Sequence, residues 1–184
     1  KDAQLRRFII VRSLLTATAL APPFMIAAAA GADEVLPLGT LVLASALAGL
    51  LSAYVWGRFS DRSSRKVLVY AGLAGGFALS ISAVLGLTGL LHPLYALPAM
   101  IFIIMIAYQG VRLGRSTHLT DMATAETRAA YTALSNTVVG VVLLAGGLFS
   151  VLAAVTGPAV VLLVMAGMAG LASVLALGLD EVQA

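Results

Sequence analysis

Two amide side chains stand inside apolar stretches of this 184-residue sequence, Gln109 near the end of one stretch and Asn136 within the next. An amide that faces hydrocarbon gives up its hydrogen bonds to water, so each amide should face a polar cavity or a polar partner. Thr16 and Tyr108 are further candidates for the lining of such a cavity. Hydrogen bonds that only join neighbouring helices explain the two amides equally well. The weaker candidates are the hydroxyl residues Thr18, Ser45, Ser52 and Ser135.

Cationic side chains near the ends of the apolar stretches are the next candidates. Arg12 lies near one end of the first stretch, where its long side chain can reach lipid headgroups or, alternatively, contact a ligand or a gate. Arg112 and Arg115 follow the fourth stretch, and Asp121 and Glu126 come soon after them. These four charges suit an inner gate on the cytoplasmic side of a cavity. A solvated loop that only sets the orientation of the chain explains them equally well.

The residue types argue against a catalytic site or a metal site. The sequence has no cysteine, and all eight Asp and Glu residues lie outside the apolar stretches. His118, which we expect in a loop, and His92 have no second ligand at metal spacing. We therefore expect no catalytic residue, no metal site, no cofactor and no enzyme activity.

Six apolar stretches must position these residues. Apolar residues make up 61% of the chain and charged residues 10%, and the mean hydropathy is +1.05, which is more than one soluble core can hide. Each stretch is long enough to cross a membrane as a helix, and none alternates like the strands of a barrel. We predict an all-α membrane protein with a single domain over residues 1–184. The expected spans are about 8–30, 36–56, 67–90, 94–111, 129–155 and 159–179.

The basic residues gather on one side if these spans alternate in direction. That side holds both termini and the loops at 57–66 and 112–128, whereas the other side offers Asp33, Glu34 and His92. The positive-inside rule then predicts cytoplasmic termini in a plasma membrane or a bacterial inner membrane. The lipid bilayer is the expected partner, and nucleic acid is not. The eleven basic residues are Lys1, Arg6, Arg7, Arg12, Arg58, Arg62, Arg65, Lys66, Arg112, Arg115 and Arg128.

The loop between the second and third spans has the sequence GRFSDRSSRK. Gly57 would let the second helix pack closely against a neighbour, and Asp61 could accept hydrogen bonds from a helix N-terminus. Arg62, Arg65 and Lys66 would then hold this carboxylate and face lipid phosphates. A plain positive-inside anchor is the alternative, although an anchor needs neither Gly57 nor Asp61.

This loop resembles the signature of the major facilitator superfamily, G-x-x-x-D-R-x-G-R-[RK]. Five of the six defining positions match, and Ser64 stands where the family usually has Gly. The resemblance implies a six-helix half made of two inverted three-helix repeats, paired with a complementary half in the same polypeptide or in a second copy. It implies that Gly57, Asp61, Arg62, Arg65 and Lys66 form a latch between the halves. The basic segment before the first span favours the C-terminal half.

The resemblance also implies a function. The first, second, fourth and fifth helices would line a cavity for a small-molecule solute, which a secondary transporter moves by alternating access. The alternative is a structural or assembly subunit of a membrane complex, or a channel, in which polar residues only join helices. Saturable flux separates the transporter from this alternative.

Overall fold

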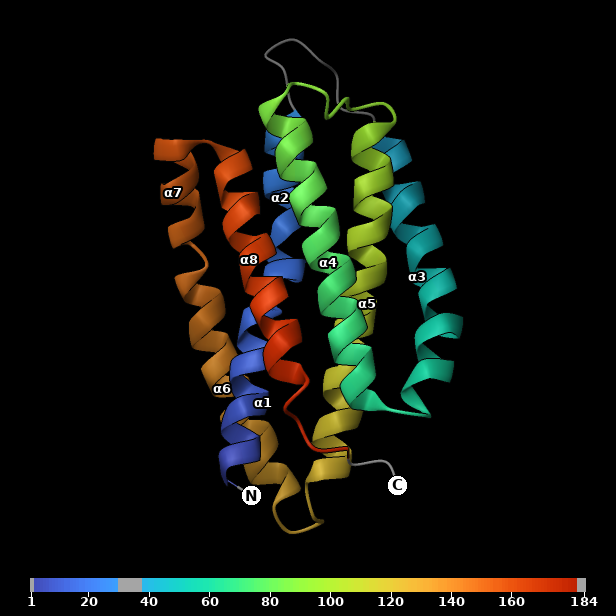
Figure 1. Cartoon of the computed structure of the whole chain (residues 1–184), viewed down its shortest axis with the longest axis vertical. Coiled ribbons are helices and arrows are strands. Elements are labelled where there is room, and N and C mark those ends of the chain that lie inside the picture. The colour runs from blue at the N-terminus through green and yellow to red at the C-terminus, as the bar shows by residue number, and fades with distance from the viewer. Residues whose placement is uncertain (1, 30–37, 182–184) are drawn as a thin grey trace.

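The computed structural model describes residues 2–29 and 38–181, and the regular elements of this part of the chain are all α-helices (Figure 1). Lys1, Asp33 and Glu34, which entered the charge argument above, lie outside the described residues. The helices are α1 (Asp2–Leu14), α2 (Ala17–Ala29), α3 (Leu38–Ser60), α4 (Ser64–Leu87), α5 (Ala96–Met122), α6 (Arg128–Ala145), α7 (Leu148–Thr156) and α8 (Pro158–Ala176).

Six helical stretches in the described part of the chain are long and apolar enough to cross a membrane. The first consists of α1 and α2, which are separated by a short break at residues 15–16. The fifth consists of α6 and α7, which meet at Gly146 and Gly147. The other four are the single helices α3, α4, α5 and α8. The predicted all-α fold with six membrane-crossing helices is therefore confirmed.

The fourth helix is longer than the sequence suggested. We expected a span that ends near residue 111 and a loop at 112–128, but α5 continues to Met122. Gly114, His118 and Leu119 of this extension are buried, and with Val111, where the expected span ended, they lie on one face of the helix. The placement of His118 in a loop was therefore wrong. Its ring stacks on Phe8 of α1 with the centroids 5.4 Å apart.

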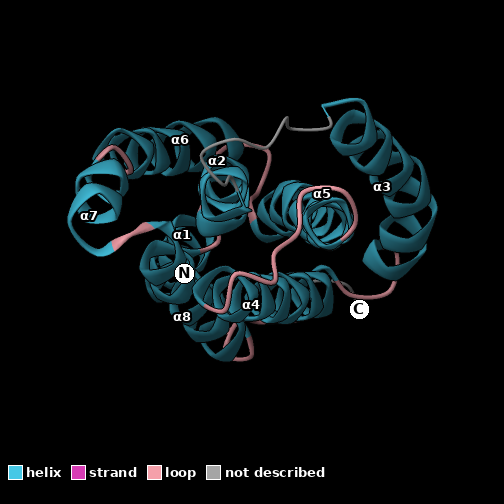
Figure 2. Ribbon diagram, turned by 90° about the horizontal axis from the view of Figure 1, so that it is seen from above, coloured by secondary structure: helices cyan, strands magenta, loops and turns pink. Residues whose placement is uncertain are grey.

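Viewed along its length, the bundle has α5 near its middle and the other helices around it (Figure 2). α4 and α8 lie along one side, and α6, α2 and α3 lie along the other. The closest packing joins α4 to α8 and to α5, and α5 to α3. Small residues allow this approach: a Cβ atom added at Gly72 of α4 would meet the Ser173 side chain of α8 at 2.3 Å.

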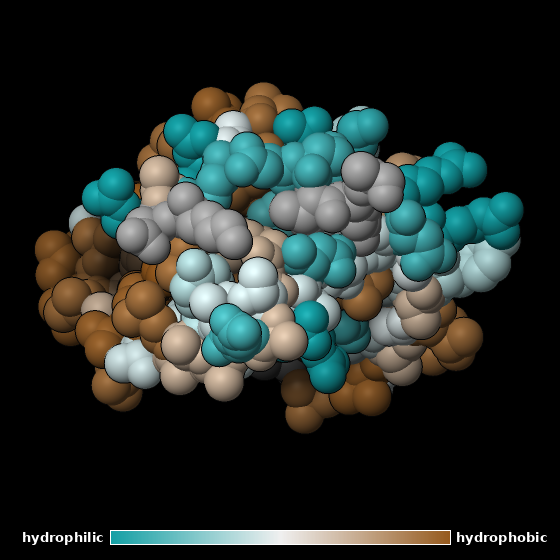
Figure 3. Space-filling model, turned by 90° about the horizontal axis from the view of Figure 1, so that it is seen from below, coloured by the Kyte–Doolittle hydropathy of each residue, from teal (hydrophilic) through white to brown (hydrophobic). Residues whose placement is uncertain are grey.

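Both termini lie at the same end of the bundle (Figure 1). This end also holds the turn between α3 and α4 and the connection between α5 and α6. Seen from below, it carries many hydrophilic residues, and apolar residues surround it at the sides (Figure 3). We call it the basic end, because its turns and helix ends carry Arg6, Arg7, Arg62, Lys66 and Arg128.

Candidate functional site

A cavity of about 160 Å³, with apolar walls and several polar side chains, lies between α1, α2, α5 and α6. Its apolar lining includes Val111, Val139 and Ala19. Three arginines line this one space, so we call it the arginine cavity. Its polar lining consists of Arg12, Thr16, Thr18, Tyr108, Arg112 and Arg115.

The side chain of Arg12 reaches from α1 to α6. Its Nη1 donates to Ser135 Oγ at 2.5 Å, and its Nη2 donates to Asn136 Oδ1 at 2.7 Å. Ser135 is fully buried, and Arg12 Nε is buried with no hydrogen-bond partner among the described residues. These contacts hold the guanidinium group within the bundle, whereas a headgroup anchor would extend it toward the membrane surface.

Arg112 and Arg115 add their charges from α5. They lie three residues apart and therefore on the same helix face, and Tyr108 lies one turn before Arg112. At a rise of about 1.5 Å per residue, Arg12, Arg112 and Asn136 each lie about 12–15 Å from the basic end of their helix. The three residues therefore share a level inside the bundle.

A second cavity of about 540 Å³ lies between α3 and α5. Gln109, Ser52 and Trp56 line it, and Arg112 lines both cavities. Ser52 Oγ is buried with no hydrogen-bond partner among the described residues. Arg112 thus lies between the two cavities, which together involve α1, α2, α3, α5 and α6.

The predicted cavity residues separate into three groups. Arg12, Thr16 and Tyr108 line the arginine cavity. Asn136 binds the Arg12 side chain, and Gln109 lies on the second cavity. The Thr16 hydroxyl donates to the backbone oxygen of Ser13 within its own helix, at 2.6 Å.

The four residues proposed as an inner gate are not joined by ion pairs. Arg112 and Arg115 line the arginine cavity, whereas Asp121 lies near the end of α5 and Glu126 in the connection that follows. Between described residues, no ion pair within 4 Å links either arginine to either acid. A gate made of these residues stays a prediction for another state of the protein.

The signature loop is a tight turn, because α3 ends at Ser60 and α4 begins at Ser64. Asp61 is exposed in this turn, and the N-terminus of α4 is capped by Ser63, whose Oγ accepts from the Lys66 backbone N–H at 3.1 Å. A Cβ atom added at Gly57 would meet no described atom within 4 Å. The close packing that we expected at Gly57 is therefore not made with a described residue.

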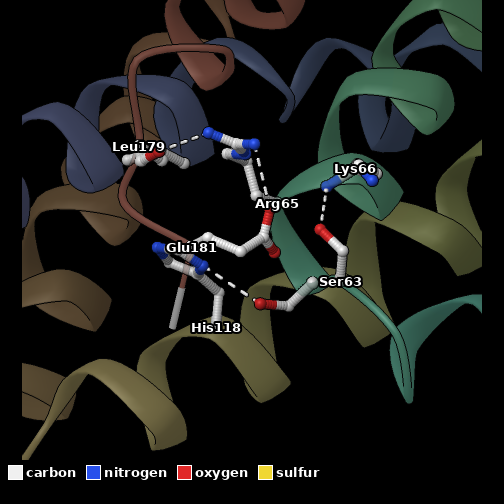
Figure 4. Close-up of polar contacts among 7 residues, drawn as sticks. Ser63, Arg65, Lys66, His118, Leu179 and Glu181 are labelled. Carbon is white, nitrogen blue, oxygen red and sulfur yellow. Dashed lines mark hydrogen bonds and ion pairs between the residues drawn. The ribbon is translucent and has the colours of Figure 1, made fainter. Parts of the chain in front are cut away.

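Arg65 binds the C-terminal segment and not Asp61, contrary to the expectation that the basic residues of the loop hold this carboxylate. It forms an ion pair with Glu181 at 2.9 Å and donates to the backbone oxygen of Leu179 at 3.2 Å (Figure 4). Close by, His118 Nδ1 and Ser64 Oγ lie 3.1 Å apart.

Contacts of the C-terminal segment were not foreseen from the sequence. Gln4 Nε2 donates to Asp180 Oδ1 at 2.8 Å, and Arg7 donates to the backbone oxygen of Gly178. Together with Arg65, these contacts fasten residues 178–181 to α1 and α4. The opposite charges of the two ends of the chain were the only signal, and charge alone does not select partners so far apart in sequence.

Comparison with known proteins agrees with this arrangement. No curated protein and no solved structure shows significant similarity to the chain. The sequence pattern of the Major Facilitator Superfamily, however, matches residues 8–183, which is nearly the whole chain. With six apolar helices, a signature turn between the second and third of them and this full-length match, the chain belongs to the major facilitator superfamily.

Proposed function

We propose that this chain is one half of a secondary transporter that moves a small solute by alternating access. The observation that carries the proposal is the arginine cavity, in which three guanidinium groups lie between four helices, about 12–15 Å along these helices from the basic end of the bundle. Charged groups that are held between the helices of a membrane protein are costly, and they usually mark a ligand path. The helices around the two cavities belong to the first, second, fourth and fifth spans, as the family resemblance implies for a solute site.

A complementary six-helix half is the expected partner, in the same polypeptide or as a second copy. Gly57 and Asp61 support this expectation, because both are part of the family signature, Asp61 is exposed, and a Cβ atom added at Gly57 would meet no described atom within 4 Å. Large apolar side chains are also exposed on α3 and on α6 and α7. The partner half and lipid would share these surfaces, with the latch motif at the junction. Examples are Leu50, Tyr54, Leu144 and Val155.

We further propose that the basic end faces the cytoplasm in a plasma membrane or a bacterial inner membrane. Lys and Arg are retained on the cytoplasmic side during insertion, and the described basic residues lie in the half of the bundle nearest this end or in its turns. The C-terminal half is the better assignment, since a basic segment leads into the first span.

Cysteine accessibility tests alternating access without knowledge of the solute. Ala19 is exposed on the arginine cavity, near the middle of the first span, and this chain has no cysteine of its own. In the native protein carrying Ala19→Cys and no other reactive cysteine, we expect a membrane-impermeant thiol reagent to react from either face of the membrane. The reagent would reach this thiol from one face in the outward-open conformation of the protein and from the other face in the inward-open conformation.

The control is Val174→Cys on α8, on the opposite side of the bundle (Figure 2). This position is exposed and lies outside the cavity lining, where we expect lipid to cover it, so it should stay unreactive from both faces. If Ala19→Cys reacts from neither face or from one face only, alternating access through this cavity is wrong, and a structural subunit becomes the better interpretation.

A further inference from the structure

The charged side chains that line the arginine cavity are all positive. Three guanidinium groups line it, and its lining contains no Asp or Glu. Between described residues, Arg112 and Arg115 take part in no hydrogen bond or ion pair, and Arg12 binds only the neutral groups of Ser135 and Asn136. The cavity therefore holds positive charge that residues 2–29 and 38–181 do not neutralise.

Headgroup anchoring does not account for Arg12, which differs in this respect from the exposed Arg112 and the half-buried Arg115 of the same cavity. The residues that suit anchoring, such as Arg6 and Arg62, are exposed at the basic end. Arg12, by contrast, is bound to a fully buried serine, with its Nε enclosed and unpartnered. A link between helices does not require a charge either, because a neutral amide could bind Ser135 and Asn136 at lower cost of burial.

We propose that the solute is an anion and that its carboxylate or phosphate group binds among Arg12, Arg112 and Arg115. Guanidinium groups bind both anions through charge-assisted hydrogen bonds, and Arg12 has N–H donors beyond the two that its neighbours accept. Positive charge at a shaped, apolar-walled site also concentrates anions there. This inference rests on the proposed transport function and names the chemical class of its substrate.

The sign of the cavity's potential can be measured at Ala19→Cys with two thiol reagents of similar size. One is 2-sulfonatoethyl methanethiosulfonate, an anion, and the other is 2-(trimethylammonium)ethyl methanethiosulfonate, a cation. Relative to a free thiol in solution, we expect the anionic reagent to be favoured by at least about tenfold. Equal rates, or a preference for the cation, overturn the inference.

Matched variants test whether the three arginines of the cavity cause the preference for the anionic reagent. Arg12→Gln and Arg115→Gln should each lower it severalfold, and Arg115→Gln does so without loss of a described contact. Arg6→Gln removes an exposed arginine of the same helix as Arg12 and should leave the preference unchanged. An equal loss in Arg6→Gln means that the net charge of the protein is the source, and the inference fails.

Protection of Ala19→Cys from a neutral maleimide identifies the anion. Inorganic phosphate or succinate should slow labelling, and glucose and choline should not. Vesicles of phosphatidylcholine with and without phosphatidylglycerol separate a soluble anion from a lipid phosphate. Protection by the anionic lipid alone, or by none of the anions, contradicts an anionic solute. Reaction from only one face contradicts the transport proposal itself, so the two failures are distinct.

Discussion

At the scale of single residues, Gly110 decides how closely three helices approach. A Cβ atom added there would lie 2.6 Å from the Trp56 ring of α3 and 2.9 Å from Ala71 Cβ of α4. The Trp56 ring has little freedom to move away, because its Nε1 donates to the backbone oxygen of Ile106 at 2.8 Å. The side-chain space on this face of α5 is therefore already filled.

We predict that Gly110→Ala destabilises the protein by about 1–3 kcal/mol through overpacking. Gly140→Ala is the matched control: Gly140 is also helical, an added Cβ there meets no described atom within 4 Å, and alanine favours a helix by about 0.5–1 kcal/mol. Unfolding in detergent, followed by circular dichroism, would compare them. Equal effects of the two changes would show that helix propensity dominates and that packing at Gly110 does not.

At this scale the sequence predicted which residues need polar surroundings, but not which partners they contact. The cost of burying an amide or a guanidinium in hydrocarbon identifies Arg12 and Asn136 as residues that need a polar environment. That Arg12 binds Ser135 and Asn136 depends on how α1 meets α6, and these partners lie 123 and 124 residues away in sequence. Gln109, two residues before Val111 on the same helix, falls on the second cavity because its position around α5 differs.

At the scale of elements, the start of α4 depends on Ser63. Its extended backbone and its Oγ, which accepts from the Lys66 N–H, make it the N-cap of a helix that packs against both α5 and α8. We predict that Ser63→Ala lowers the free energy of unfolding by about 1 kcal/mol.

Ser80→Ala in the middle of α4 is the control for the cap. The Ser80 hydroxyl is exposed and donates to the Gly76 backbone oxygen of its own helix, so its loss should change stability by less than about 0.5 kcal/mol. If both variants lose the same stability in a denaturant titration, the capping role of Ser63 is refuted.

Hydropathy foretold the existence of all six crossing helices, because each must hide its backbone from lipid. It did not foretell the end of α5, since residues 112–122 are largely polar and yet remain helical. What holds them in the fold is a narrow buried face that includes Val111, His118 and Leu119. This pattern depends on packing against α1 and α4, which a measure of average apolarity does not detect.

At the scale of the whole molecule, Asp61 is placed where it can contact the complementary half. The carboxylate is exposed in the turn after α3, and Ser63 already caps the helix that follows. A helix N-terminus of the complementary half is the partner that its charge favours. The latch would then stabilise one of the two access states.

We predict that Asp61→Asn changes the ratio of labelling from the two faces at Ala19→Cys by about two- to fivefold, as expected for the loss of a charge at a helix N-terminus. Membrane insertion should be intact. Arg58→Gln, an exposed change in the same region but outside the latch residues, should leave the ratio unchanged. If the ratio is unchanged in Asp61→Asn, the latch role of Asp61 is wrong, and the signature turn acts only as a basic anchor.

The cavity can serve a transporter only if the helices cross the bilayer in alternating directions with the basic end in the cytoplasm. Labelling of single cysteines in intact cells with an impermeant thiol reagent tests this most directly. Leu90→Cys lies in the exposed connection between α4 and α5, and Ala125→Cys lies in the exposed connection between α5 and α6 at the basic end. We predict that Leu90→Cys reacts in intact cells and that Ala125→Cys reacts only after permeabilisation. Labelling of both in intact cells, or of Ala125→Cys alone, would contradict the proposed topology.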